Sequence, residues 1–538
     1  SNLIPGAGYL VRVFVFTRTF ERGPFGLYVL SMAIAAPTIG LLTQWILRPS
    51  MRFYAEYQGL GKGDMYREVL ASLNLRLMLL VMLIGAATAI PLWASGWLGG
   101  HAVLASGVFV FVLGSVPATN ALAVVRSSLR PGSFFGVTVL AEIVSIGVPL
   151  VFVFTVSRDI GWLAWGQALA VWIALPYTLV LTGITPSAAR LRLSPEARRI
   201  ILRFARYGTP MVLWWAGANL LSLEDRYVLE AFRGSSEVAV YGVNYDFISA
   251  ASTLLNGTLV LGFGPVLYHH WAQGRRSEVA KAIGRTTDLY FFLGLGFIGG
   301  VIAVGPAIET FLMGANFRAG LPLLVPVAAG TVFFGLSVIG HKTLELGEGM
   351  FAMATGAIIA GAVNLALNLA LVPRYGYIAS ADASACCYAL YAALIWWQSR
   401  RYVQWEIHAR PFIQAIAVAA AATVAALLAE LSLNRDSLAR LTVGTSAYVA
   451  VFVLLVLAAQ RQELAQTFGA RASRRGKLSP EIIRRLEVAA AQAAAGGSES
   501  ALQGAWSGAA FHSQTDTVVS VEEGVESESA VAQVDLQV

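Results

Sequence analysis

The stretch LYFFLGLGFIGGVIAVGPAIETFL, residues 289–312, decides the fold class of this chain. It is apolar for more than the roughly 20 residues that an α-helix needs to cross the hydrocarbon core of a bilayer. Its one charged residue is Glu309. We therefore predict that this stretch is a transmembrane helix.

Runs of the same kind recur along the whole chain and alternate with short polar breaks. The predicted fold class is thus an all-α polytopic membrane protein with about fourteen transmembrane helices. Their predicted ranges are Leu3–Thr17, Leu27–Leu47, Ser72–Ser95, Ala102–Val125, Phe134–Val156, Trp162–Gly183, Pro210–Phe232, Val238–Tyr268, Leu289–Leu312, Leu321–Gly340, Phe351–Val372, Tyr377–Trp397, Phe412–Leu431 and Leu441–Ala459. The first run is short for a span, and we interpret it as a helix that lacks roughly half of its length.

The composition excludes several classes of protein. The chain is 57% hydrophobic and 13% charged, whereas a soluble domain is about 45–50% apolar and about 25% charged. Its basic residues are spread over short loops instead of one face, which argues against a nucleic-acid partner. Cys386 and Cys387 are adjacent inside an apolar run, so we expect neither a disulfide nor a metal site.

Lysine and arginine are concentrated in alternate loops between the predicted spans. The loops that follow even-numbered spans, together with the tail, hold about three times as many of these residues as the opposite loops. By the positive-inside rule, the N-terminus, the longer loops and the C-terminal tail are cytoplasmic.

The opposite loops are short, and this matters for function. A membrane glycosyltransferase, ligase or polymerase needs a long extracytoplasmic loop for its catalytic groups. The sequence also has no Walker loop, no HExxH or GxSxG motif and no paired carboxylates on a soluble loop. We therefore expect a protein that is not an enzyme, has no cofactor and is not driven by ATP.

The two halves of the chain repeat each other at a nearly constant offset. Phe135 and Arg158 are separated by the same interval as Phe351 and Arg374. Six helices per half is an even number, so both halves enter the membrane from the same side, as in a parallel repeat. Two bundles around a central cleft are typical of alternating-access transporters.

The repeat predicts how the chain is divided. The predicted segments are an N-terminal six-helix bundle at 1–183, a basic cytoplasmic linker at 184–207, a second six-helix bundle at 208–400, two appended transmembrane helices at 401–459 and a cytoplasmic tail at 460–538. The tail is predicted to be helical near Ser479–Ala495 and then disordered, because its end is small, polar and acidic.

Five segments, taken in order, are similar to those of one family. They are RTFERGPFGLY at 18–28, RFYAEY at 52–57, RYGTP at 206–210, DRYVL with VYGVNY at 225–245, and NLALN with VPRYG at 364–376. In these segments, over about Leu3 to Ala459, the chain resembles the polysaccharide (Wzx-type) flippases of the multidrug/oligosaccharidyl-lipid/polysaccharide (MOP) exporter superfamily. It departs from the family at Ala379-Ser-Ala-Asp-Ala, where glycine and alanine are more usual, and in its long tail.

The resemblance implies a MATE-like V-shaped cleft and a function. A flippase of this kind moves an undecaprenyl-pyrophosphate-linked oligosaccharide across the bacterial inner membrane by alternating access, for O-antigen, lipopolysaccharide or exopolysaccharide synthesis. Its expected partners are the lipid-linked glycan, membrane lipid and other polysaccharide-assembly membrane proteins. The alternatives are a cation or drug antiporter of the same superfamily, which would need an anionic cleft, and a glycan polymerase or ligase.

Polar residues inside the predicted spans are the candidate site. An arginine at the bilayer centre costs about 2.5–3.5 kcal/mol on insertion scales, so it normally faces protein or water. The candidate cavity residues are Arg12, Arg18, Arg52, Asp225, Arg226, Asn244, Tyr245, Asn364 and Asn368. The arginines would contact phosphate oxygens, although Arg12 at a trimmed helix start could instead snorkel to the interface.

Each of the other candidates has a structural interpretation beside the functional one. Asp225 and Arg226 would form either a structural ion pair or a gate, and the asparagines and Tyr245 would touch sugar hydroxyls or bond one helix to another. Glu142 and Glu309 are two further acids in the spans. Either carboxylate could couple transport to protons.

Overall fold

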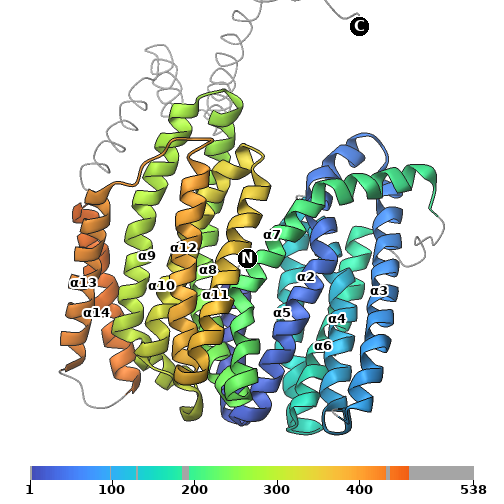
Figure 1. The fold of residues 1–538 in the computed structure, drawn as a ribbon, viewed down its shortest axis with the longest axis horizontal. Coiled ribbons are helices and arrows are strands. Elements are labelled where there is room, and N and C mark those ends of the chain that lie inside the picture. The colour runs from blue at the N-terminus through green and yellow to red at the C-terminus, as the bar shows by residue number, and fades with distance from the viewer. Residues whose placement is uncertain (1–2, 97, 129–130, 185–192, 432–436, 460–538) are drawn as a thin grey trace, which may run out of the picture. The chain divides into compact units, whose positions relative to one another are not determined.

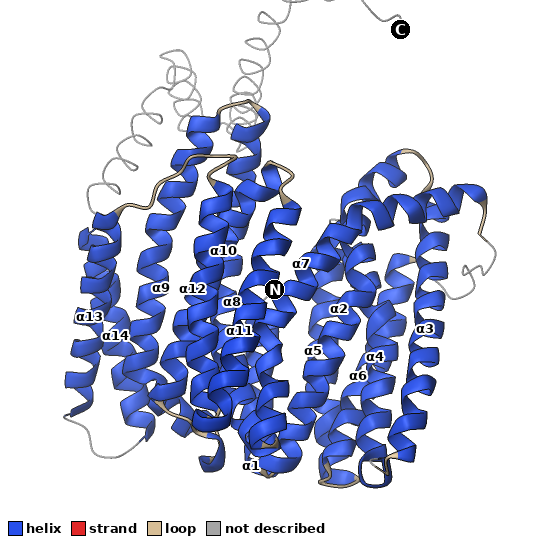
Figure 2. Cartoon of the chain, in the orientation of Figure 1, coloured by secondary structure: helices blue, strands red, loops and turns tan. Residues whose placement is uncertain are grey.

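The computed structural model describes residues 3–96, 98–128, 131–184, 193–431 and 437–459. The described residues up to Val456 form one compact unit. The predicted tail helix and acidic end lie outside the described residues. The described residues contain helices and no strand, which confirms the all-α fold (Figures 1 and 2).

Each of the fourteen α-helices of the described residues overlaps one of the predicted spans. They are α1 (Leu3–Thr19), α2 (Arg22–Gly59), α3 (Gly63–Ala94), α4 (Leu98–Ser127), α5 (Pro131–Thr155), α6 (Ile160–Thr182), α7 (Pro195–Arg233), α8 (Ser235–Ala272), α9 (Arg276–Leu312), α10 (Leu321–Leu346), α11 (Met350–Tyr375), α12 (Tyr377–Ser399), α13 (Ala409–Leu431) and α14 (Ser437–Ala459), with a short 3₁₀ helix η2 (Ala315–Phe317) before α10. Twelve of these helices are long and apolar enough to cross a membrane. The protein is therefore a multi-pass membrane protein.

Several helices extend well beyond their apolar stretches. The predicted span Leu27–Leu47 lies within α2, which continues to Gly59, and α7 begins at Pro195 rather than at Pro210. Ser194 caps the N-terminus of α7, because its hydroxyl accepts a hydrogen bond from the amide of Ala197 at 3.1 Å. The prediction of a connecting loop at 184–207 is thus wrong from Pro195 onward.

The helices pack in two sets that α7 joins. In the first set, α4 and α5 pack on α6, and α2 packs on α4. In the second set, α10 packs on α12, and α8 and α9 pack on α10. Helix α7 lies against α2 on one side and α11 on the other, and α13 packs on α9 (Figure 1). The division into two repeated bundles with the boundaries given above stays a prediction.

Helices α2 and α7 approach each other closely because glycines face the partner helix. A Cβ atom on Gly208 of α7 would lie 2.4 Å from the carbonyl oxygen of Trp45. One on Gly40 of α2 would lie 1.9 Å from the indole nitrogen of Trp215. Glycine at both positions lets the two backbones and a tryptophan pack without a gap, as small residues do between membrane helices.

Replacing one of these glycines tests the packing. Gly208→Ala is expected to lower the free energy of unfolding by about 1–3 kcal/mol, because the new methyl group meets backbone of α2 that cannot rotate away. Gly147→Ala in α5 is the matched control, since nothing lies within 4 Å of its Cβ position. Thermal unfolding of the purified protein in detergent measures both. Equal unfolding temperatures for the two variants would contradict the close packing.

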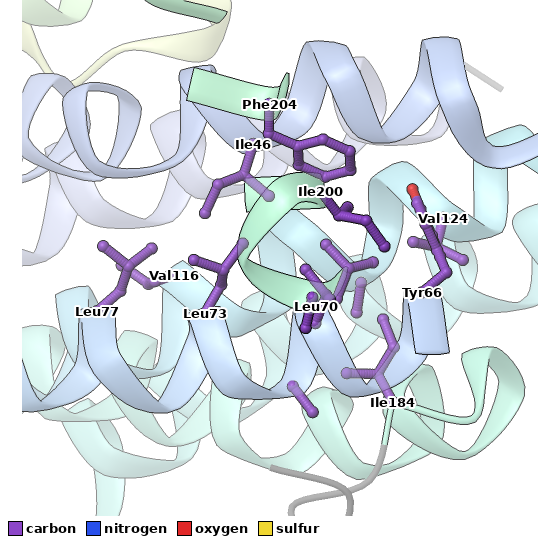
Figure 3. Close-up of a cluster of buried hydrophobic side chains, with 14 of the residues drawn as sticks. Ile46, Tyr66, Leu70, Leu73, Leu77, Val116, Val124, Ile184, Ile200 and Phe204 are labelled. Carbon is purple, nitrogen blue, oxygen red and sulfur yellow. The ribbon is translucent and has the colours of Figure 1, made fainter. Parts of the chain in front are cut away.

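A hydrophobic cluster holds the first turns of α7 against the end of the first helix set. Ile200 and Phe204 of α7 are buried together with Ile46, Tyr66 and Leu70 (Figure 3). The hydroxyl of Tyr66 donates to the carbonyl oxygen of Ser50 at 2.8 Å. Burying a side chain such as Phe204 contributes roughly 1.5–3 kcal/mol, so these turns are fixed by packing rather than by their own helix propensity.

Candidate substrate cavity

A cavity of about 450 Å³ lies among α1, α2, α7 and α8, with single contributions from α4 and α6. Most of its lining side chains are apolar. The polar ones are Tyr9, Arg12, Tyr28, Gln167, Arg226 and Asp246. Two of the arginines predicted from the sequence therefore face one cavity, although they are more than two hundred residues apart.

Arg12 lies on the cavity wall and is held by α5. Its Nη2 lies 3.0 Å from Oε1 of Glu142, and its Nη1 donates to the hydroxyl of Ser145 at 2.8 Å. Gly8 is one turn earlier on α1, and a Cβ atom there would lie 1.9 Å from Oε1 of Glu142. Gly8 and Arg12 are four residues apart and so share the face of α1 that meets α5. The alternative that Arg12 snorkels to the interface does not match this geometry.

Arg226 reaches the same cavity from α7. Its side chain is only 2% exposed, and its Nη2 lies 2.6 Å from Oδ1 of Asp246 on α8. The guanidinium also lies over the ring of Tyr245, 5.1 Å from its centre. The Asp246 side chain is 47% exposed, and it borders the cavity. The pair thus presents one partly open carboxylate and one buried cation to the cavity.

The predicted ion pair between Asp225 and Arg226 is not seen, because Arg226 pairs with Asp246 instead. Asp225 is fully buried, accepts a hydrogen bond from the backbone amide of Arg226 at 2.8 Å and accepts another from the hydroxyl of Tyr241. Neighbours in sequence point in different directions on a helix, so the guanidinium meets Asp246 of the next helix instead. Asp225 is a packed residue and does not line the cavity.

A second cavity, of about 300 Å³, continues from the first along α4, α5 and α6. The two cavities share Phe111 and Gln167. Glu142 and Ser145 line the second cavity, whereas Arg12 lines the first. The Arg12–Glu142 pair therefore stands where the two cavities meet.

The predicted amide and tyrosine contacts lie between packed helices rather than on the cavity wall. Asn244, Asn364 and Asn368 are each 0% exposed, and Tyr245 is buried. Asn364 donates to the carbonyl oxygen of Leu221 at 3.2 Å, and Asn244 donates to that of Phe317 at 2.8 Å. Without water, polar groups in a membrane interior find partners on neighbouring helices. We therefore assign these residues to helix packing in this structure.

Two buried amide oxygens in this group are of the kind that binds hard cations, but too few of the described acidic side chains accompany them for a metal site. Asn368 donates to Oε1 of Glu224 at 3.1 Å, and the amide oxygens of Asn364 and Asn368 have no hydrogen-bond partner among the described residues. Carboxylate and amide oxygens are the ligands that hard cations prefer. The described part of the chain holds no group of three or more His, Cys, Asp or Glu side chains suited to a metal.

Arg18 and Arg52 do not reach either cavity. Arg18 is exposed, and it donates to the carbonyl oxygens of Phe311 and Leu312 at 2.8 and 2.6 Å. These carbonyls end α9, and a cation at a helix C-terminus is favourable. Arg52 is exposed near the end of α2 and lines neither cavity. Neither arginine is therefore a cavity residue in this structure, contrary to the expectation from the sequence.

Glu309 has a structural role that the sequence did not reveal. It is 2% exposed, and its carboxylate accepts hydrogen bonds from the backbone amides of Ala319 and Gly320 at 2.9 and 3.0 Å. It therefore holds the turn that leads into α10. Because the carboxylate is occupied by backbone donors away from the cavity, the prediction that it couples transport to protons does not fit this structure.

A substitution tests whether Glu309 stabilises the fold. Glu309→Gln is expected to lower the free energy of unfolding by about 1–3 kcal/mol, because charge-assisted bonds to two amides are lost. Glu278→Gln is the matched control, since the Glu278 carboxylate is partly exposed and holds no backbone amide. Thermal unfolding measures the difference. A Glu309→Gln protein that is as stable as wild type, or one whose transport alone changes, would contradict the structural role.

Aromatic side chains on the wall of the first cavity pack against η2. Phe16 and Phe25 line the cavity. The ring of Phe25 packs edge-on against Phe317 at 5.6 Å and stacks with Phe20 at 6.2 Å. The amide of Gly314 also donates to the hydroxyl of Thr17 at 2.9 Å, which ties α1 to the segment before α10.

Comparison with solved structures places the fold. No protein-family model matches this chain. No curated protein matches it. The fold is similar to those of two solved membrane transporters. The lipid II flippase MurJ, in an inward closed conformation, is similar over 86% of this chain and 100% of its own, with a TM-score of 0.66 and 12% identity. A multidrug resistance MATE family transporter in an inward-facing conformation is similar over 74% of this chain and 93% of its own, with a TM-score of 0.58 and 12% identity. At this identity the likeness establishes the fold.

Proposed function

We propose that this protein is a flippase for a lipid-linked oligosaccharide, the cargo being an undecaprenyl-pyrophosphate-linked glycan of the bacterial inner membrane. The observation that carries the proposal is that Arg12 and Arg226 line one cavity inside an exporter fold. A guanidinium group offers a planar set of donors that matches phosphate oxygens. The glycan would serve surface polysaccharides such as O-antigen or exopolysaccharide.

The carboxylates beside the arginines keep the empty cavity neutral. A single charge away from water is costly unless it is paired, and Glu142 and Asp246 provide that pairing. An arriving diphosphate would take over guanidinium donors from both acids. The carboxylate that loses its cation would then bind a proton or turn to water. We therefore keep Glu142 as the proposed site of proton coupling, because it stands where the two cavities meet.

The second cavity supplies room for sugars. A glycan cannot cross about 30 Å of hydrocarbon unaided, so the protein must surround it with polar groups. The cavity along α4, α5 and α6 has Ser115, Thr119, Thr178 and Gln167 among small apolar side chains. These side chains can bond to sugar hydroxyls while the diphosphate lies at Arg12. The prenyl tail would stay in the bilayer.

Two further points support a lipid-linked cargo over a cationic drug. An antiporter for cations would need an excess of acids in its cavity, whereas here each acid on the wall is matched by an arginine. The lipid II flippase is also similar to a larger share of this chain than the MATE transporter is.

Deletion of the gene tests the proposal. We expect complete repeat units to accumulate on the lipid carrier in the cytoplasmic leaflet and the surface glycan to disappear. A plasmid copy of the wild-type gene should restore both, which is the control. Normal surface glycan together with lost export of cationic dyes would overturn the flippase proposal in favour of the antiporter. Complete repeat units that reach the periplasmic leaflet but are not joined or attached to the surface would point instead to a polymerase or ligase.

A further inference from the structure

The first turns of α7, residues 195–208, form an amphipathic segment. Ala197, Ile200, Phe204 and Gly208 are buried, at spacings of three and four residues. This spacing places them on one face of the helix. The opposite face is exposed and consists of Arg198, Arg199, Leu202, Arg203, Arg206 and Tyr207.

The buried face and two ion pairs hold the segment in one orientation. Arg203 makes two bonds to the carboxylate of Glu56 on α2, at 2.6 and 3.0 Å. Lys62 lies 2.6 Å from Oε1 of Glu196, and this hydrogen bond raises the pKa of Lys62. Together with the packing of Ile200 and Phe204 in Figure 3, these contacts decide which face points away from the protein.

The outward face combines positive charge with apolar surface. Arg198, Arg199 and Arg206 have no ion pair within the described ranges of the chain. Leu202 and Tyr207 beside them are 62% and 44% exposed. Three like charges within three turns repel each other unless anions lie nearby. A basic face that also bears leucine and tyrosine is the composition of helices that lie in a membrane interface.

The length of α7 places this segment at the membrane surface. The helix has 39 residues and would be about 58 Å long if straight, whereas the hydrocarbon core is only about 30 Å thick. A large part of α7 therefore lies outside the hydrocarbon. Figure 1 shows that its first turns run across the ends of α2 and α3, and the remainder descends among the other helices.

We propose that the exposed face of residues 198–207 binds the headgroups of anionic phospholipids in the adjoining leaflet. The arginines supply charge complementary to phosphate, Leu202 inserts among the upper acyl carbons, and Tyr207 lies at the headgroup level, where tyrosine is enriched. This surface is separate from the cavity. Because the segment leads directly into the helix that joins the two helix sets, bound lipid fixes the position of that helix in the leaflet.

Lipid titration of the full-length protein in detergent tests this proposal. Phosphatidylglycerol or phosphatidylcholine is added to the micelles, and the thermal unfolding midpoint and the lipids retained in native mass spectrometry are recorded. We expect phosphatidylglycerol to raise the midpoint more than phosphatidylcholine does. In Arg198→Gln/Arg199→Gln/Arg206→Gln, half-maximal stabilisation should need at least tenfold more phosphatidylglycerol, since each arginine near an anionic surface contributes roughly fivefold in affinity.

Three controls make the outcome specific. The triple lysine variant at the same positions keeps the charge and should respond as wild type does. Arg275→Gln/Arg276→Gln/Arg285→Gln removes three exposed arginines from the start of α9 and should also respond as wild type does. Soluble glycerol phosphate should leave the midpoint unchanged. The proposal is overturned by a wild-type response in the glutamine variant, an equal loss in the α9 variant, a loss in the lysine variant, or equal stabilisation by glycerol phosphate.

Discussion

Arg226→Ala is expected to destabilise the protein by about 3–5 kcal/mol, the typical cost of removing one partner of a buried ion pair. Arg226 is 2% exposed and is the cation nearest to two acids, Asp246 at 2.6 Å and the fully buried Asp225 next to it in sequence. Without the guanidinium, Asp246 faces the cavity with no counter-charge, and the ring of Tyr245 loses the cation that covers it. Both effects act on the core of the second helix set.

A matched pair of variants checks this expectation. Arg233→Ala, at the end of the same helix, removes an arginine whose bond to Glu237 is partly exposed and should cost at most about 1 kcal/mol. Thermal unfolding and the amount of inserted protein are measured for both. Adding Asp246→Asn to Arg226→Ala should recover part of the loss, because it removes the unpaired charge. If Arg226→Ala unfolds at the same temperature as Arg233→Ala, the buried pair does not stabilise the fold.

Arg12→Gln is expected to reduce transport at least tenfold while the protein still inserts and folds. A hydrogen bond to a charged group contributes about 1.5–3 kcal/mol, and every 1.4 kcal/mol is a factor of about ten in affinity. Arg12 is only partly buried on a cavity wall, so glutamine can occupy its place without a void. The loss should therefore appear mainly in cargo binding, because Glu142, which loses its cation, borders the second cavity and can bind a proton there.

The matched control is Arg52→Gln, which removes an exposed arginine that reaches neither cavity. It should leave transport near wild type. Surface glycan, lipid-linked intermediates and the amount of inserted protein are compared for both variants in the deletion strain. Normal glycan in Arg12→Gln would remove Arg12 from the site, and an equal defect in Arg52→Gln would show that the cavity is not the determinant.

Most of the secondary structure could be predicted because the bilayer leaves few choices. A chain that crosses hydrocarbon must satisfy its backbone hydrogen bonds internally, so an apolar run such as 289–312 has to be helical, and it lies inside α9. The ends of helices were predicted poorly. Where α7 begins depends on the capping Ser194 and on Phe204 packing against other helices, and hydropathy carries no signal for such contacts.

The candidate site was predicted in part for a similar reason. A charged side chain in a membrane segment is so costly that Arg12 and Arg226 could be singled out before their positions were known. Gln167, Tyr9 and Asp246 also line the cavity. None of the three is among the candidate cavity residues named from the sequence.

Hydropathy established that this protein is a helical bundle in a membrane and that charged groups such as Arg12 and Arg226 need polar partners, because both follow from the free energy of transferring single residues into hydrocarbon. The tertiary structure alone decided which groups meet. Arg226 pairs with Asp246 rather than Asp225. Arg18 donates to a carbonyl oxygen at the C-terminus of α9, and Glu309 accepts hydrogen bonds from the turn before α10. Each of these contacts depends on how different helices or turns pack against one another. The type of a residue does not specify the direction in which its side chain points in the fold.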